Sequence, residues 1–155
     1  MQPIVGEIHK SLLKNHKTVA VAESCTGGLT SAMLTELPGS SAFFLLGAIT
    51  YSNAAKERVL KVPSVIIKEN GAVSKIVAVS MAGSVRKIVG ADFGIGITGI
   101  AGPGGGTPLK PVGTVYIACS DKNKTICKKF IFKGSRGRIR AQAALKALQL
   151  LKTML

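Results

Sequence analysis

Hydroxyl side chains and glycines gather in one short segment, ESCTGG at residues 23–28, directly after a β-branched run. A serine at the end of a strand, beside backbone N–H groups at the start of a helix, has the surroundings that acyl transfer needs. Ser24 is the candidate nucleophile of this segment. Serine and threonine before a helix also act as caps, and more often so, which leaves both interpretations open for this segment alone.

A second segment, YSNAAK at residues 51–56, supplies a phenol and an amine just past another predicted strand. A lysine kept neutral by burial, or a tyrosinate stabilised by that lysine, can accept the proton of a serine. The two histidines, His9 and His16, both fall in a predicted surface helix at the start of the chain. Their position argues against a Ser-His-Asp triad and favours Tyr51 or Lys56 as the base.

A third segment is rich in glycine. Gly94, Gly96 and Gly99 match G-x-G-x-x-G, but the prolines and glycines that follow forbid the helix that a dinucleotide-binding fold requires. No Gly-Lys-Ser/Thr follows either, which excludes a P-loop. What remains is a loop at residues 98–107 after a predicted buried strand, where backbone N–H groups could approach a ligand. A simple connector with no ligand is the alternative.

The elements that must position these segments follow from hydrophobic periodicity. Helices are predicted at residues 4–17, 26–37, 53–60 (capped by Asn53), 74–89 and from about Ser135 onward, and strands at 18–23, 43–51, 92–98, 112–120 and 125–132. This order predicts an α/β domain with a mixed sheet covered by helices on both faces. In a simple hairpin around residues 121–124, Cys119 and Cys127 would lie opposite one another.

Composition is consistent with a single domain over residues 1–155. The chain is 46% hydrophobic, and its three cysteines have neither metal-ligand spacing nor an even count for a disulfide framework. The start of the chain lacks a secretory signal pattern, so we expect a cytoplasmic protein. The uncharged stretch at residues 37–55 is interrupted by proline, glycine and polar residues, and it predicts a loop and a buried strand rather than a membrane span.

Charge is distributed unevenly. The formal net charge is +14, and every charged residue after Asp121 is basic. Such a field favours anionic ligands, whether nucleotide phosphates, nucleic acid or an acidic surface. A solvated basic face without a partner is an equally good interpretation of the pattern.

Four segments resemble the CinA C-terminal domain family, in the same order along the chain: VAESCTGG (21–28), LPGSSAFFLLGAITYSNAAK (37–56), GAVS (71–74) and TGIAGPGGGTPLKPVGTVYIA (98–118). The resemblance implies a three-layer α/β/α sandwich with a mixed, mainly parallel five-stranded sheet. It also implies a nicotinamide-nucleotide amidase, which converts nicotinamide mononucleotide and water to nicotinate mononucleotide and ammonia without a metal. Some members carry a larger N-terminal domain, which we do not expect here.

The resemblance also implies roles for individual residues. Ser24 would be the nucleophile, with Tyr51 and Lys56 handling protons. Oxyanion, phosphate and other substrate contacts would come from Glu23, Thr26, Gly27, Gly28, Thr98, Gly99, Gly102, Gly104, Gly105, Arg136 and Arg140. One departure stands out: Ser135 occupies a position where family members commonly have aspartate, and it could still cap the last helix.

Two further functions stay open from the sequence. A nucleic-acid or acidic-partner binding module would use the basic C-terminal segment, although the chain has no tryptophan and few aromatic residues for base stacking. A regulatory module that binds a nucleotide without turnover would use the glycine loops. We expect a nucleotide as the small-molecule substrate, nonspecific binding of polyanions, a homo-oligomer, no cofactor, no metal and no membrane partner.

Overall fold

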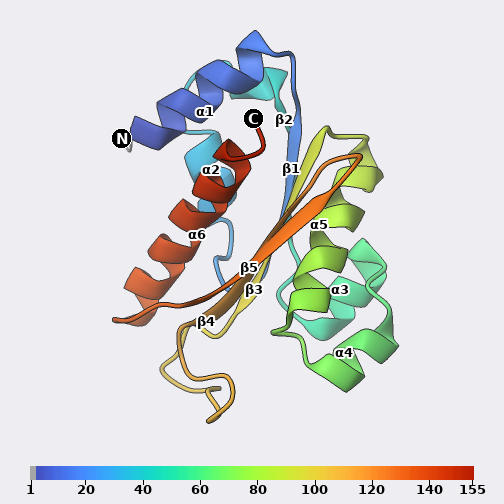
Figure 1. Cartoon of the computed structure of the whole chain (residues 1–155), viewed down its shortest axis with the longest axis vertical. Helices are drawn as coiled ribbons and strands as arrows, with labels where there is room; N and C mark the ends of the chain where they lie inside the picture. The colour runs from blue at the N-terminus through green and yellow to red at the C-terminus, as the bar shows by residue number, and fades with distance from the viewer. Residues whose placement is uncertain (1–2) are drawn as a thin grey trace.

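The computed structural model describes residues 3–155. Its elements, in chain order, are α1 (Pro3–Lys14), β1 (Val19–Glu23), α2 (Leu29–Leu34), the 3-10 turn η1 (Ser40–Ala42), β2 (Phe44–Ile49), α3 (Asn53–Leu60), α4 (Ser64–Asn70), α5 (Lys75–Val89), β3 (Phe93–Gly99), β4 (Thr114–Ser120), β5 (Thr125–Ile131) and α6 (Arg136–Lys152). Figure 1 shows one sheet with α1, α2 and α6 on one side and α3, α4 and α5 on the other. This is the three-layer α/β/α sandwich expected from the sequence.

The sheet has the strand order β2-β1-β3-β4-β5. β1 pairs in parallel with β2 and with β3, whereas β4 is antiparallel to both β3 and β5. Four strands therefore run in one direction and β4 runs in the opposite one, which confirms the expected mixed, mainly parallel sheet. Of the four pairs of neighbouring strands, two are parallel and two are antiparallel. The carboxyl ends of β1, β2 and β3 consequently meet at one edge of the sheet.

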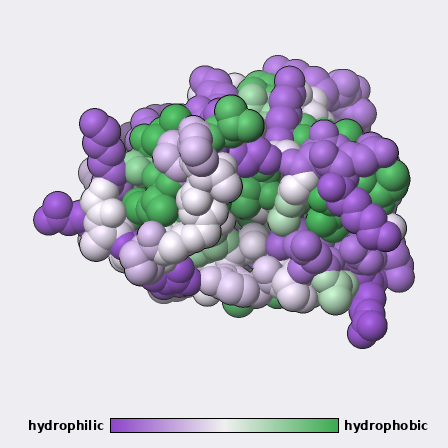
Figure 2. Space-filling view, turned by 90° about the horizontal axis from the view of Figure 1, so that it is seen from below, coloured by the Kyte–Doolittle hydropathy of each residue, from purple (hydrophilic) through white to green (hydrophobic). Residues whose placement is uncertain are grey.

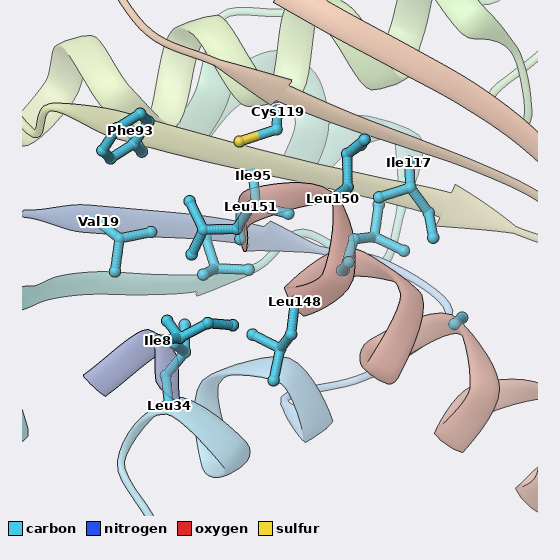
Figure 3. Close-up of a cluster of buried hydrophobic side chains, with 14 of the residues drawn as sticks. Ile8, Val19, Leu34, Phe93, Ile95, Ile117, Cys119, Leu148, Leu150 and Leu151 are labelled. Carbon is cyan, nitrogen blue, oxygen red and sulfur yellow. The ribbon is translucent and has the colours of Figure 1, made fainter. Parts of the chain in front are cut away.

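The larger core lies between the sheet and the helices α1, α2 and α6. Figure 3 shows Ile8, Leu34 and Leu148 from the three helices facing strand residues such as Ile95 and Ile117, all almost completely buried. A second cluster, with Leu60, Val77 and Met81 among its members, fills the space between the sheet and α3, α4 and α5. Burial on both faces explains the continuous hydrophobic runs of β1 and β3.

The glycines that imitate a dinucleotide-binding motif serve packing instead. A Cβ atom on Gly94 would lie 2.1 Å from the backbone oxygen of Ala82, and one on Gly96 would lie 2.3 Å from that of Ala78. Both contacts are with the backbone of α5, so these glycines let α5 lie directly against β3. β3 then continues into a loop and not into a helix, which confirms that the match to G-x-G-x-x-G is accidental.

Several expectations about local structure were wrong. Helix α2 begins at Leu29 and not at residue 26, because Gly27 and Gly28 adopt positive φ of +58° and +100° and form a turn outside the helix. Ser52, not Asn53, caps α3. The short helix α4 was not predicted, since only one of its seven side chains, Ile67, is buried and gives little periodic signal.

Two further expectations failed at the edges of the sheet. β2 is an edge strand with Leu45 and Ile49 exposed, so it is not a buried strand. In the β4–β5 hairpin Cys127 pairs with Ala118 while Cys119 pairs with Ile126, so the two cysteines are not opposite one another. The register is offset by one residue from the symmetric hairpin, and such an offset puts the two thiols on different faces.

Candidate functional site

A cavity of about 270 Å³ opens at the edge where the parallel strands end. It collects residues that follow β1, β2 and β3, because those three strands run in the same direction. Its lining consists of Ser24, Cys25, Tyr51, Asn53, Lys56, Ala72, Val73, Thr98, Gly99, Ile100, Ala101, Gly102, Gly104, Gly105 and Arg136. Nine of the residues expected from the sequence are therefore brought together here.

The centre of the cavity is a contact between Ser24 and Lys56. Nζ of Lys56 lies 3.1 Å from Oγ of Ser24, 2.9 Å from the backbone oxygen of Thr50 and 3.4 Å from that of Tyr51. Ser52 fixes the approach of α3, because its Oγ accepts a hydrogen bond from Ala55 N at 3.0 Å. This cap places Lys56 in the first turn of the helix, from which its side chain reaches back under the end of β2.

The amine of Lys56 is in an unusual environment for a lysine. The residue is only 1% exposed. Burial lowers the pKa of Lys56 from the usual 10.5, against a smaller opposing effect of Cys25. No acidic side chain accepts a hydrogen bond from this amine within residues 3–155, since its partners are two carbonyls and a hydroxyl. Burial therefore shifts this amine toward its neutral form relative to an exposed lysine, and the neutral form is the one able to accept a proton.

Cys25 stands next to Ser24 and also lines the cavity, so its thiol is an alternative nucleophile. The pKa of Cys25 is raised to about 11, mainly by burial and to a smaller extent by the negative charge of Glu23, while a backbone hydrogen bond, Lys56 and Arg140 partly oppose the shift. A thiol with so high a pKa stays protonated at neutral pH, and the thiol is a much weaker nucleophile than the thiolate. The geometry and the charge state together favour Ser24.

Glu23 is placed differently from what the sequence suggested. Its side chain is completely buried and its carboxylate accepts four hydrogen bonds, from the backbone N–H groups of Gly28, Thr30 and Ser31 and from the hydroxyl of Ser31. The carboxylate therefore caps the start of α2 from within the protein. Neither Glu23 nor Gly28 lines the cavity, and the N–H groups expected to face a substrate are occupied by this internal anion.

Arg140 acts on the turn that follows Ser24. Its Nε donates to the backbone oxygen of Cys25 at 3.1 Å, and its Nη2 donates to that of Thr26 at 2.9 Å. Gly27 completes the turn, with its N–H donating to the oxygen of Ser24 at 3.1 Å. Thr26, Gly27 and Arg140 thus lie behind the nucleophile turn and outside the cavity lining, where they shape the turn instead of facing a ligand.

Arg136, in the first turn of α6, connects the segment after β2 with the loop after β3. Its guanidinium donates to the phenol oxygen of Tyr51 at 2.7 Å and to the backbone oxygen of Gly102 at 2.8 Å. Ser135 caps α6 through a hydrogen bond from Arg138 N, as its type allowed. The phenol of Tyr51 is exposed and faces Arg136, so only the backbone of Tyr51 approaches Lys56 and the expected proton-handling pair of these two side chains is not formed.

The end of β3 and the loop after it form the remaining wall. The hydroxyl of Thr98 donates to the backbone oxygen of Ala72 at 2.8 Å, which ties β3 to the segment before α5. Gly99, Gly102, Gly104 and Gly105 present backbone to the cavity. Figure 2 views the molecule from this end and shows a surface on which pale residues of near-neutral hydropathy run between green and purple ones.

Sequence reasoning assigned no site role to some of the lining residues. Asn53, Val73 and Ile100 line the cavity, and each lies in a segment singled out from the sequence, but none carries a group with obvious chemistry for the reaction. Asn53 was interpreted as a helix cap. It lines the same cavity as Cys25 and Lys56 only because α3 packs at this edge of the sheet. Within the described residues no group of histidines, cysteines and acids is arranged to hold a metal ion. None of the described helices has the length and apolar character needed to cross a bilayer.

Comparison with known proteins gives a consistent result. The family model described as "CinA C-terminal domain" matches residues 1–155. A CinA-like protein of Citrifermentans bemidjiense is 51% identical over 138 residues, which are 89% of this chain and 33% of that protein. One from Syntrophotalea carbinolica is 46% identical and covers 99% of this chain and 37% of that protein. The chain thus spans about a third of the length of these curated relatives.

Solved structures agree over nearly the full length of both chains. The competence/damage inducible protein CihA from Agrobacterium tumefaciens superposes with a TM-score of 0.95 at 37% identity, covering 97% of this chain and 93% of that one. A CinA superfamily protein from Escherichia coli gives a TM-score of 0.94 at 31% identity, with 98% and 88% covered. At these identities the likeness extends beyond the fold to the family.

Proposed function

The chain belongs to the CinA C-terminal domain family, and from that membership and the geometry of its cavity we propose that it is a nicotinamide-nucleotide amidase. The reaction converts nicotinamide mononucleotide and water to nicotinate mononucleotide and ammonia. The observation that carries the proposal is the 3.1 Å contact between a buried lysine amine and Ser24 Oγ at the base of a cavity. A hydroxyl beside a neutral amine is the arrangement of a serine–lysine nucleophile.

The hydrogen-bond partners of Lys56 support this chemistry. A neutral amine has two N–H groups and one lone pair, and the two backbone oxygens, of Thr50 and Tyr51, can accept both N–H groups. The lone pair then faces the hydroxyl of Ser24. In this state Ser24 donates its proton toward Nζ, which prepares Oγ for attack on a planar carboxamide.

The proposed reaction has two halves. Lys56 takes the proton of Ser24, Oγ bonds to the carboxamide carbon, and the carbonyl electrons move to oxygen. The C–N bond then breaks, the proton on Lys56 goes to the leaving nitrogen, and ammonia departs from an ester on Ser24. In the second half Lys56 removes a proton from water, the resulting hydroxide attacks the ester, and Ser24 leaves with that proton. Atoms and charge balance over the two steps.

The rest of the cavity suits an anionic nucleotide. Arg136 stands at the rim with a cationic guanidinium, and glycine backbone from Gly102 to Gly105 lines the same wall. A guanidinium fits the oxygens of a phosphate in two-point contact. We therefore place the 5′-phosphate near Arg136 and the carboxamide near Ser24. Arg140 donates to the backbone oxygens of Cys25 and Thr26 and lies outside the cavity lining, so it does not serve as the phosphate ligand in this proposal.

The test is direct. Purified protein is incubated with nicotinamide mononucleotide, and ammonia and nicotinate mononucleotide are measured together. The wild type releases both in equal amounts, Ser24→Ala releases neither, and Ser41→Ala, at an exposed position away from the cavity, behaves as wild type. Circular dichroism checks that the variants are folded. A folded wild type that releases no ammonia, or a Ser24→Ala protein with full activity, refutes the proposal.

A further inference from the structure

A hollow with a different lining lies away from the cavity that holds Ser24. It has a volume of about 460 Å³ and runs between α5 and the turn of the β4–β5 hairpin. Because β4 is antiparallel to β3, its last residue, Ser120, pairs with Gly94 at the start of β3. The hollow is therefore at the opposite end of the sheet from the nucleophile, and the two share no lining residue. We call it the hairpin groove.

Four cations line the hairpin groove from two sides. Arg86 and Lys87 come from α5, and Lys122 and Lys124 come from the turn. Between residues 3 and 155 the salt bridges are Lys17–Asp92 and Lys152–Glu7, so none of these four is held in an ion pair. Four cations that face one another beside a single acid, Asp121, repel one another, and an anion between them reduces that repulsion.

The single acid of the groove is already engaged. One carboxylate oxygen of Asp121 accepts the backbone N–H groups of Asn123 and Lys124, at 2.7 and 2.8 Å, and so closes the turn. These bonds fix the turn that presents Lys122 and Lys124. Asp121 offsets one of the four positive charges, which leaves a clear excess of positive charge in the groove.

The uncharged lining suits an oxyanion as well. Ser80 and Ser84 lie one helical turn apart on α5 and both line the groove. The hydroxyls of Ser120 and Thr125 also line it, but they donate to the backbone oxygen of Asp121 and to Ser120 Oγ within the hairpin. Hydroxyls and lysines are common donors to phosphate oxygens. A second hollow of about 380 Å³ adjoins the first and shares Arg86, Asp121, Lys122 and Asn123 with it. The charged residues that it adds are Lys17 and Asp92, which form a salt bridge, so it adds no excess of positive charge.

From these groups we infer that the hairpin groove binds a ligand carrying two or more adjacent phosphates, at a site separate from the amidase cavity. One phosphate carries about 1.5 to 2 negative charges at neutral pH, which is less than the positive charge that remains in the groove once Asp121 has offset one of the four cations. No aromatic ring lines the groove, so bases would gain no stacking there. Recognition is therefore through the phosphates, and an inorganic oligophosphate is a sufficient probe.

The experiment measures binding of inorganic tripolyphosphate to the full chain by titration calorimetry. Lys122→Ala with Lys124→Ala removes two exposed cations of the groove. Lys128→Ala with Lys146→Ala removes two cations from a different hollow beside α6, so the net charge falls equally in both. We expect one tripolyphosphate per chain, affinity at least about tenfold weaker in the groove variant, and affinity within about threefold of wild type in the control variant. Added salt should weaken binding steeply.

Three outcomes would overturn the inference. Equal weakening in both double variants would mean that the ligand senses only the overall charge. Orthophosphate binding as tightly as tripolyphosphate would mean that the groove holds a single phosphate. A single-stranded oligonucleotide of about 20 nucleotides that binds while tripolyphosphate does not would mean that a longer polyanion track is used. Ammonia release from nicotinamide mononucleotide should be unchanged in the groove variant, so failure of the amidase proposal would be seen separately.

Discussion

Nζ of Lys56 lies 3.1 Å from Oγ of Ser24, although 32 positions separate the two residues in the chain. The contact exists because β1 and β2 are parallel neighbours, so the segment after each strand begins at the same edge of the sheet. Ser24 follows β1 directly, and α3 returns Lys56 from the end of β2. The proposed reaction therefore depends mainly on whether the amine of Lys56 is neutral or protonated.

Replacement of Lys56 by methionine keeps the length of the side chain and removes the base. We expect kcat for ammonia release to fall by about 10³-fold, while Lys56→Arg, which keeps a permanent positive charge, should be equally inactive. The measurement is initial rate at saturating nicotinamide mononucleotide. A Lys56→Met protein with wild-type kcat would show that another group takes the proton of Ser24.

The pH profile tests the same amine in the wild type. Only neutral Lys56 can act as a base, and burial lowers its pKa below 10.5, so kcat/KM should rise with pH and reach half its plateau below 10.5. The same shift makes the unfolded chain bind more protons between the folded pKa and 10.5, so stability should rise with pH in that window. The residual activity of Lys56→Met should lack this rise, and a profile that falls with pH would contradict the assignment.

Arg140 should act on the turn rather than on the substrate. Arg140→Met removes the donors to the backbone oxygens of Cys25 and Thr26, and a small displacement of Ser24 can lower kcat by about 10²-fold. We expect KM to change by less than about threefold. Arg136→Met, which alters the cavity rim, should mainly raise KM. If Arg140→Met raises KM and spares kcat, Arg140 contacts the substrate after all.

Glu23 should contribute to stability from its buried position. Glu23→Gln replaces an oxygen that accepts backbone N–H groups with an amide NH₂, which leaves at least one buried donor without an acceptor. We expect a loss of about 2 kcal/mol in the free energy of unfolding, measured by urea titration. Glu69→Gln, on the exposed surface of α4, should change it by less than about 0.5 kcal/mol. Equal effects of the two variants would exclude the buried cap.

Two glycine variants test the packing of α5 on the sheet. Gly94→Ala puts a methyl group where the backbone oxygen of Ala82 lies at 2.1 Å, so we expect a loss of about 3 kcal/mol or more. Gly83→Ala, inside α5, would place a methyl group with nothing within 4 Å beyond its chain neighbours and the backbone of its own helix, and it should instead stabilise the protein by about 0.5 to 1 kcal/mol. Urea midpoints at unchanged m-value give both numbers. A neutral Gly94→Ala would contradict the close approach of helix and strand.

The sequence alone was sufficient for most of the elements and for the pair at the centre of the site. Hydrophobic periodicity is a local property, so it located the strands and long helices to within a few residues and missed only α4, whose surface is mostly exposed. Ser24 and Lys56 could be predicted as neighbours because each follows a strand of the same parallel sheet. The family resemblance pointed to the same residues, and the family itself is shown by the comparisons.

Tertiary structure alone decided what the groups around that pair do. The sequence does not say which acceptor an N–H group finds. Here the buried carboxylate of Glu23 accepts the N–H groups at the start of α2, and Arg140 of α6 donates to the backbone oxygens of the turn after Ser24. The same applies to the one-residue offset that separates Cys119 from Cys127 and to the cations that α5 and the hairpin bring together. These contacts join segments far apart in the chain, and their partners are fixed only when strand order, register and helix docking are set together.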